Sequence, residues 1–337
     1  MSSATRLPIL LIALSAAFAG VAIASDKDVE RTPNEWLERM NRAFLDASYD
    51  GIFTYFNGDD LSTLRVVHTV TNGVQRERLV HMNGAPREIV RTGDAVECIV
   101  QPGDVMLELE SSIPSGPFAR AFSSAFEGVS DHYALSLHGT DRVANRQSVR
   151  LAVMPRDVQR YGFRLWIDQE TGLLLRSELV DTKGVKLEIF EFATVKIGGP
   201  ISEQDLAPEF GAGALKTQLS LASTQVETAQ GKRRVNWEAH WVPDGFTMAS
   251  SDIRNMPSSA KSVDTLMYSD GLAVFSVFIE EMPENATTNL VSRSGATVAV
   301  SEVVKGPKDA HHLVTVVGEI PTATAQKIAQ SIRYVTN

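Results

Sequence analysis

The stretch that decides the fold, residues 51–84, reads GIFTYFNGDDLSTLRVVHTVTNGVQRERLVHMNG. Apolar and polar side chains alternate through it with a period of two, which is the pattern of β-strands. The dipeptides Asn57-Gly58, Asn72-Gly73 and Asn83-Gly84 interrupt this pattern, and Asn-Gly between β-prone runs is a strong signal for a hairpin. We therefore expect an antiparallel meander in this part of the chain.

The same pattern returns further along the chain. Strands are expected at residues 161–167, 173–180 and 185–195, with turns at residues 168–172 and 181–184. Upstream of both meanders, Thr32, Pro33 and Glu35 have the spacing of a capping box with proline at the first helical position. An amphipathic helix is expected over residues 33–47, and its apolar side needs a sheet to cover it.

A second, smaller domain is expected after a linker. Residues 211–231 are rich in Ala, Ser, Thr and Gln without firm periodicity, which is typical of a linker. Beyond it, strands are expected at residues 272–279, 296–304 and 313–317, followed by a helix at residues 322–333. The predicted fold class is α+β, with a large open antiparallel sheet on helices at residues 25–210 and a smaller sheet with a helix at residues 232–337.

The first residues have the features of a secretory signal. One arginine precedes an apolar stretch over residues 7–18, and small residues end in Ala22-Ile23-Ala24. We expect residues 1–24 to be a signal peptide cleaved after Ala24, which places the mature chain in the periplasm. The single cysteine, Cys98, cannot form an internal disulfide and is expected to be a small apolar residue of a strand.

Neither the charge nor the motifs point to nucleic acid or to catalysis. The net charge of −9 disfavours nucleic acid as a partner. The chain has no G-x-S-x-G elbow, no H-E-x-x-H, no phosphate-binding loop and no EF-hand spacing. The seven histidines are scattered, and His311 and His312 would face opposite ways in a strand. We therefore expect no enzyme activity, no metal site and no cofactor.

An apolar sheet face that its helices do not fill would form a cavity for an acyl chain. Strand alternation predicts that this face carries Phe53, Tyr55, Leu64, Val66, Leu165, Ile167, Leu173 and Leu175. A shift of one residue would select Ile52, Thr54 and Phe56 instead. Phe118, Phe122 and Phe126 are spaced four apart. They are either core residues or part of a mobile helix over the cavity, and we assign Phe118 and Phe122 to the cavity. His68, on the same face, is expected to be a hydrogen-bonded core residue.

Several segments carry a resemblance to a known family. Among them are GIFTY at residues 51–55, NGAPRE at 83–88, FRLWID at 163–168, TGLLLR at 171–176, YSDGLAVFSVF at 268–278 and TVVGEIP at 315–321. In these segments and in their order, the chain resembles the MucB/RseB family over essentially the whole mature sequence.

The resemblance implies a periplasmic regulator of the envelope stress response. The N-terminal domain would be an open β-barrel similar to the lipoprotein carriers LolA and LolB, and the C-terminal domain would be smaller. The protein would bind the periplasmic part of a membrane anti-sigma factor, protect it from regulated proteolysis, and release it on lipid signals such as lipid A, lipopolysaccharide or mislocalised lipoprotein. A homo-oligomer is left open, and the alternative is a lipoprotein or glycolipid carrier, with an envelope hydrolase as a third hypothesis.

Aromatic side chains of the second domain are the candidates for partner contact, because aromatic residues dominate interface hot spots. The alternative for each is ordinary core packing. The four candidates are Trp237, Trp241, Tyr268 and Phe275.

Overall fold

The structure is a computed structural model that describes residues 31–93, 95–100, 129–209, 215–220, 235–255, 262–282 and 290–335. No helix in these ranges is long and apolar enough to cross a membrane. The predicted signal peptide and the Phe118, Phe122 and Phe126 stripe lie outside the described residues.

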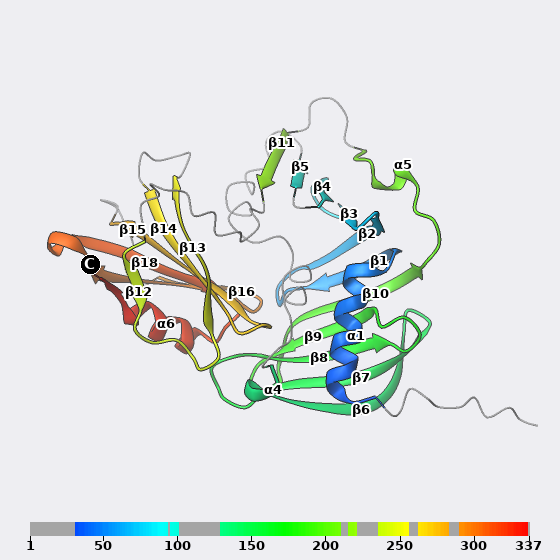
Figure 1. The fold of residues 1–337 in the computed structure, drawn as a ribbon, viewed down its shortest axis with the longest axis horizontal. Helices are drawn as coiled ribbons and strands as arrows, with labels where there is room; N and C mark the ends of the chain where they lie inside the picture. Colours follow the sequence, from blue (N-terminus) through cyan, green and yellow to red (C-terminus); the bar gives the residue numbers. More distant parts are fainter. Residues whose placement is uncertain are drawn as a thin grey trace, which may run out of the picture. The chain divides into compact units, whose positions relative to one another are not determined.

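The N-terminal part is built on one large antiparallel sheet (Figure 1). The spatial order of its eleven strands is β11-β5-β4-β3-β2-β1-β10-β9-β8-β7-β6. Two meanders, β1 to β5 and β6 to β10, are joined where β10 pairs with β1. The strands are β1 Tyr49–Phe56, β2 Leu61–Thr71, β3 Val74–His81, β4 Arg87–Thr92, β5 Ala95–Val100, β6 Tyr133–Val143, β7 Arg146–Pro155, β8 Gly162–Asp168, β9 Leu174–Val180, β10 Lys186–Ile197 and β11 Leu215–Ser220.

The sheet is unclosed: among the described residues, its end strands β6 and β11 are not bonded to each other. The predicted open antiparallel barrel is therefore confirmed. Strand β11 falls within residues 211–231, which were expected to be only a linker, and it pairs with β5. Among the described residues, three helices accompany the sheet: α1 Pro33–Asp46, α4 Val129–His132 and α5 Glu203–Leu206.

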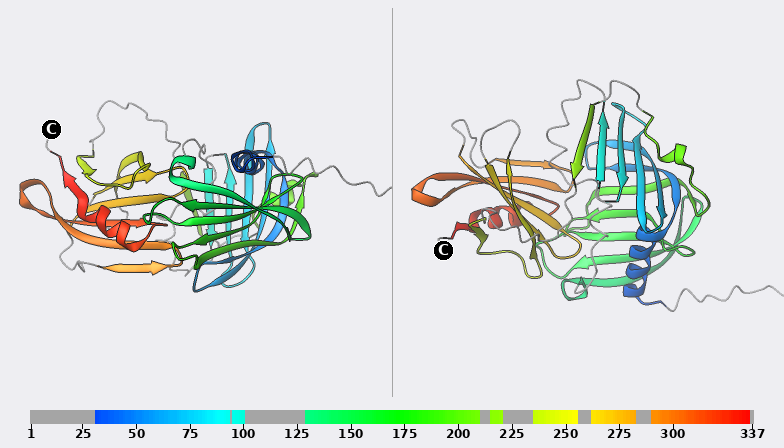
Figure 2. Two further views of the ribbon diagram at one scale, coloured as in Figure 1. Left: turned by 90° about the horizontal axis from the view of Figure 1, so that it is seen from below. Right: turned by 45° about the horizontal axis from the view of Figure 1, so that its top comes forward.

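Helix α1 begins as its sequence predicts. The Thr32 hydroxyl accepts from the Glu35 amide, and the Glu35 carboxylate accepts from the Thr32 amide at 2.6 Å. The helix buries Trp36, Leu37 and Met40 against the sheet, in a core with Leu151 and other side chains of β7 and β8. Figure 2 shows α1 end-on, lying over one face of the strands.

Tight turns fix the register of both meanders. Asn72 and Gly73 have φ values of 53° and 78°, the left-handed conformations that a two-residue hairpin turn requires. Gly172 has a φ of 84°, and a Cβ there would lie 2.6 Å from the Arg39 Cγ of α1. Larger residues are therefore excluded from Gly172 both by backbone strain and by helix packing.

The C-terminal part is a six-stranded antiparallel sheet in the order β13-β14-β15-β18-β17-β16, with α6 packed on β17 and β18. A two-stranded sheet of β12 and β19 adds to it. This confirms the smaller antiparallel sheet with a helix. The elements are β12 Trp237–Ala239, β13 Thr247–Asn255, β14 Ser262–Ser269, β15 Val274–Glu281, β16 Val291–Ser294, β17 Thr297–Lys305, the 3-10 turn Pro307–Asp309, β18 His311–Gly318, α6 Thr322–Ser331 and β19 Ile332–Tyr334.

Candidate functional site

The aromatic cluster, the side chains of Phe53, Phe190 and Phe192, marks the apolar face of the large sheet. Phe53 of β1 is paired with Phe192 of β10 and with Leu64 of β2. The ring centroids of Phe53 and Phe190 are 4.8 Å apart, and those of Phe190 and Phe192 are 5.0 Å apart and nearly perpendicular. Because paired residues share a face of a sheet, the three rings and Leu64 form one continuous apolar surface.

The predicted cavity residues divide between two cores. Phe53, Leu64, Val66, Leu173 and Leu175 are buried in the core of the aromatic cluster, with Tyr55 partly buried against it. Leu165 and Ile167 belong instead to the core that packs on Trp36 of α1. The alternative face fares differently, since Ile52, Thr54 and Phe56 are only half-buried.

One acidic side chain, Glu188 of β10, adjoins the apolar face. The Tyr55 hydroxyl donates to one Glu188 oxygen at 2.7 Å, and the Ala296 amide donates to the other at 2.9 Å. Burial raises the pKa of Glu188 above its ordinary value, and the two hydrogen bonds oppose the rise. Burial, together with the Glu188 carboxylate, also raises the pKa of the Tyr55 hydroxyl, so the tyrosine stays a proton donor.

His68 lies in the core, as expected. Its Nδ1 lies 2.8 Å from the Ala47 carbonyl oxygen, and its ring stacks on Tyr49 with centroids 5.0 Å apart. The side chain is buried, and it provides a hydrogen-bond partner for the carbonyl oxygen of Ala47, the residue that ends α1. Among the described residues, no group of three or more His, Cys, Asp or Glu side chains is placed to hold a metal ion.

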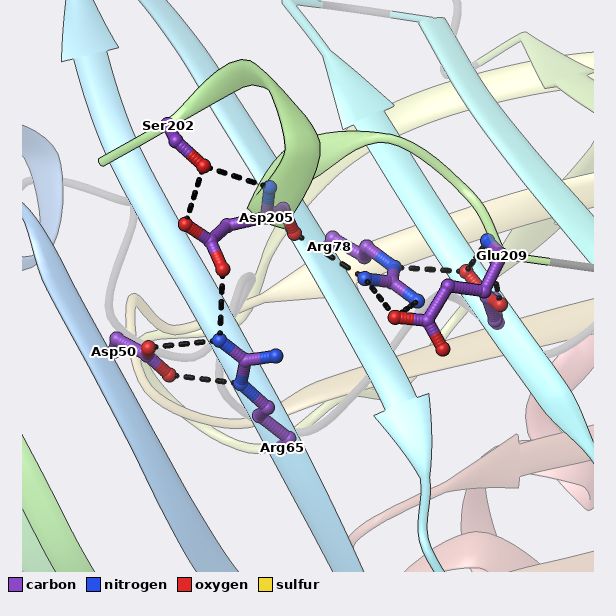
Figure 3. A network of polar contacts seen from close by, with 7 residues as sticks. Asp50, Arg65, Arg78, Ser202, Asp205 and Glu209 are labelled. Atoms are coloured by element: carbon purple, nitrogen blue, oxygen red, sulfur yellow. Dashed lines mark hydrogen bonds and ion pairs between the residues drawn. The ribbon is translucent and has the colours of Figure 1, made fainter.

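The opposite face of β2 and β3 carries charged side chains beside the buried Val67. Arg65 alternates with Leu64 and Val66, and Arg78 precedes Leu79, so the arginines point away from the apolar face. Arg78 and Glu88 form a 2.8 Å ion pair in which the side chains are 1% and 0% exposed. Figure 3 shows the segment around α5 lying over this charged face, with Asp205 directed toward Arg65 and Glu209 toward Arg78.

The four aromatic candidates of the C-terminal part occupy or border its core. Trp237, Tyr268 and Phe275 are buried there, with Tyr268 and Phe275 stacked at 5.1 Å. Trp241 is only partly buried, and the Lys327 ammonium lies 3.7 Å from its ring centroid. Trp241 is therefore the member of the group with exposed aromatic surface.

Sequence reasoning missed the groups that join distant segments. Phe190 and Phe192 lay in a predicted strand, and their alternation with Glu191 was a usable signal for a shared face. Arg160 and Asp270 form a fully buried pair across 110 residues of sequence. A pair at that separation leaves no periodic pattern in the sequence.

Comparison with known proteins gives the same result for both parts of the chain. The MucB/RseB N-terminal domain matches residues 32–210, and the MucB/RseB C-terminal domain matches residues 231–333. The sigma factor AlgU regulatory protein MucB of Pseudomonas aeruginosa is 38% identical over 301 residues, covering 89% of this chain and 90% of that protein. The sigma-E factor regulatory protein RseB of Escherichia coli is 26% identical over 326 residues, a match that covers 96% of this chain and 98% of that protein. A solved complex of Pseudomonas aeruginosa MucA and MucB matches with a TM-score of 0.74 at 34% identity, over 90% of this chain and 99% of that one.

Proposed function

The chain belongs to the MucB/RseB family, and we propose that it is a periplasmic negative regulator of an extracytoplasmic stress sigma factor. In this proposal it binds the periplasmic part of a membrane anti-sigma factor and protects that partner from regulated proteolysis. The observation that carries the proposal is the match to a MucA/MucB complex along 90% of the chain. A relative that binds its partner with the same two-part chain supports an equivalent interaction here.

Partner contact is assigned to the exposed aromatic surface of the C-terminal part. Trp241 offers ring surface beside Lys327, and large aromatic side chains near a positive charge suit an extended acidic or mixed peptide. Trp237, Tyr268 and Phe275 support that surface from the core. Their contribution to binding is to hold its shape.

Lipid release is assigned to the apolar face of the large sheet. Tyr55, Leu64, Val66, Leu173 and Leu175 pack with the aromatic cluster in one core, and Leu165 and Ile167 lie in the neighbouring core that packs on α1. Burying each CH₂ group of an acyl chain is worth roughly 0.8 kcal/mol, so such a face suits lipid A or a lipoprotein acyl chain. A lipid that binds the partner-free state of the protein better than the partner-bound state weakens partner binding. By thermodynamic linkage, the partner then weakens lipid binding by the same factor.

The test is a calorimetric titration of the mature protein with the periplasmic domain of the anti-sigma factor from the same organism. Tight one-site binding is expected, and added lipid A should weaken it at least about tenfold, the lower part of the usual allosteric range. Lipid A binding without any partner binding would overturn the regulator and favour the carrier. Partner binding that is indifferent to lipid A would remove the lipid signal and keep the regulator.

Export is tested separately by mass spectrometry of the protein recovered from the periplasm. The proposal requires a chain that begins at Ser25, without a lipid adduct. A chain that retains residues 1–24 would contradict the assignment.

A further inference from the structure

The strap, residues 202–209, crosses the charged face of the large sheet and contacts strands β2, β3 and β4 in turn. Asp205 accepts from Arg65 of β2 at 3.1 Å, and Glu203 accepts from Arg76 of β3 at 2.6 Å. The Glu209 amide donates to Glu88 of β4 at 3.0 Å. Figure 3 shows the contact of Asp205 with Arg65 and that of Glu209 with Arg78. The buried Leu206 adds an apolar anchor to the strap.

Glu88 is the central group of this arrangement. One of its oxygens accepts from the Arg78 guanidinium at 2.8 Å, and its other oxygen accepts the strap amide of Glu209. Arg78 in turn donates to the Asp205 carbonyl oxygen at 3.3 Å. Because Arg78 and Glu88 are buried while Glu203 is 80% exposed, the buried pair carries most of the attachment.

The strap determines where the chain leaves the sheet. Strand β11 begins six residues after Glu209 and pairs with β5 from Leu215↔Val100 to Ser220↔Ala95. With the strap and β11 in place, the connection to the C-terminal part starts at Ser220. Without them it would start at Ile197, the end of β10, which adds a reach of roughly 75 Å at about 3.3 Å per residue.

We propose that the strap is a releasable attachment, a clasp, that sets the length of the connection between the two parts of the protein. Glu88 is the residue on which this attachment chiefly depends. Release of the strap frees β11 from the edge of β5. The strap holds β2, β3 and β4 from the face opposite Leu64, Val66 and Leu79, so movement of these strands on the apolar side is transmitted to it. This inference does not depend on which partner the protein binds.

The experiment is hydrogen exchange of the mature chain, followed by mass spectrometry of peptides that cover residues 202–209, 215–220 and 87–100. In Glu88→Gln, exchange in the strap and in β11 is expected to rise at least about tenfold. Glu38→Gln is the matched control, because it removes an exposed carboxylate from α1 and should leave all three peptides unchanged.

A second set of variants tests the clasp if Glu88→Gln fails to fold. Arg76→Glu should speed exchange of the strap severalfold, as expected for loss of a surface ion pair. Arg76→Glu combined with Glu203→Arg should restore it. Faster exchange of the strap with unchanged protection of residues 215–220 would overturn the proposal, as would a double variant no better than Arg76→Glu.

Discussion

Arg160 and Asp270 form an ion pair with a 2.6 Å contact between Nη1 and Oδ2, and neither side chain is exposed to solvent. Arg160 precedes β8, and Asp270 lies in the turn between β14 and β15. The other Asp270 oxygen accepts the amides of Leu272 and Ala273, and the Tyr133 hydroxyl donates to Oδ2 at 3.0 Å. The carboxylate is thus saturated by donors, which offsets the cost of burying it.

Removing one member of this pair should be strongly destabilising. Arg160→Ala leaves the Asp270 carboxylate buried without its counter-charge, a change that typically costs about 3–5 kcal/mol of the free energy of unfolding. Urea denaturation followed by fluorescence measures it. Asp157→Ala is the matched control, because Asp157 also contacts Arg160 but is 32% exposed, and it should cost less than about 1 kcal/mol. Equal costs for the two variants would show that Asp270 is not the principal partner.

Truncating the aromatic cluster should reveal which sheet face is the core. Phe53→Ala removes a ring that is 7% exposed and packs on Phe190 and Phe192, so a cost of about 3–5 kcal/mol is expected. Its neighbour Ile52 lies on the other face and is half-buried, so Ile52→Ala should cost clearly less. The two free energies of unfolding, measured side by side, check the register of β1. The reverse order would place the apolar face one residue away.

Local signals predicted much of this fold. The capping box at Thr32, Pro33 and Glu35 located α1 to within one residue, and the Asn72-Gly73 turn located the hairpin of β2 and β3. The hairpin of β6 and β7 was not predicted, because its turn residues Ala144 and Asn145 adopt φ values of 48° and 62° without a glycine. A turn without glycine gives a weaker sequence signal than Asn-Gly does.

Contacts between distant residues were beyond the reach of periodicity. Alternation selected Phe53, Leu64 and Val66 as one face, and the structure buries all three in one core. It could not show that Leu165 and Ile167 pack in a different core, because that division depends on where α1 lies. Nor could it pair Arg78 with the strap, since Glu209 is 131 residues away.

The raised pKa of Glu319 predicts how the free energy of unfolding changes with pH. Burial, with the Glu188 carboxylate as a second cause, raises the pKa of Glu319 from 4.5 to about 8. Between these values the folded state binds more protons than the unfolded state, so the free energy of unfolding should fall as pH rises from about 5 to about 8. The slope from this group is at most about 1.4 kcal/mol per pH unit.

Glu319→Gln removes this titration, so its free energy of unfolding should depend less on pH than that of the unaltered protein. Urea denaturation at pH 5, 6, 7 and 8 gives both profiles. Glu38→Gln, which alters an exposed carboxylate of α1, should keep the original slope. Parallel profiles for Glu319→Gln and the unaltered protein would contradict the assigned pKa.

Substitutions of Trp241 and of Trp237 should differ in their effects on partner binding and on stability, although the two residues are only four positions apart in the sequence. The Trp241 ring is only partly buried, and its carbonyl oxygen accepts from the Ser331 hydroxyl at 3.0 Å, a backbone contact that any substitution retains. Trp241→Ala should therefore change the free energy of unfolding by less than about 1 kcal/mol, the Lys327 contact being its main loss. Because Trp241 is proposed to be an interface hot spot, Trp241→Ala should weaken binding of the anti-sigma periplasmic domain at least about tenfold.

Trp237 is 5% exposed and packs edge-on against Tyr334, so Trp237→Ala should cost about 3–5 kcal/mol of stability before any effect on binding. Lys327→Met keeps the Trp241 ring and removes only its cation, which isolates the ring's own contribution to the interface. Calorimetric titration and urea denaturation of all three variants supply both quantities. If Trp241→Ala binds like the unaltered protein, the exposed ring is not part of the interface, and the partner must engage a different surface of the C-terminal part.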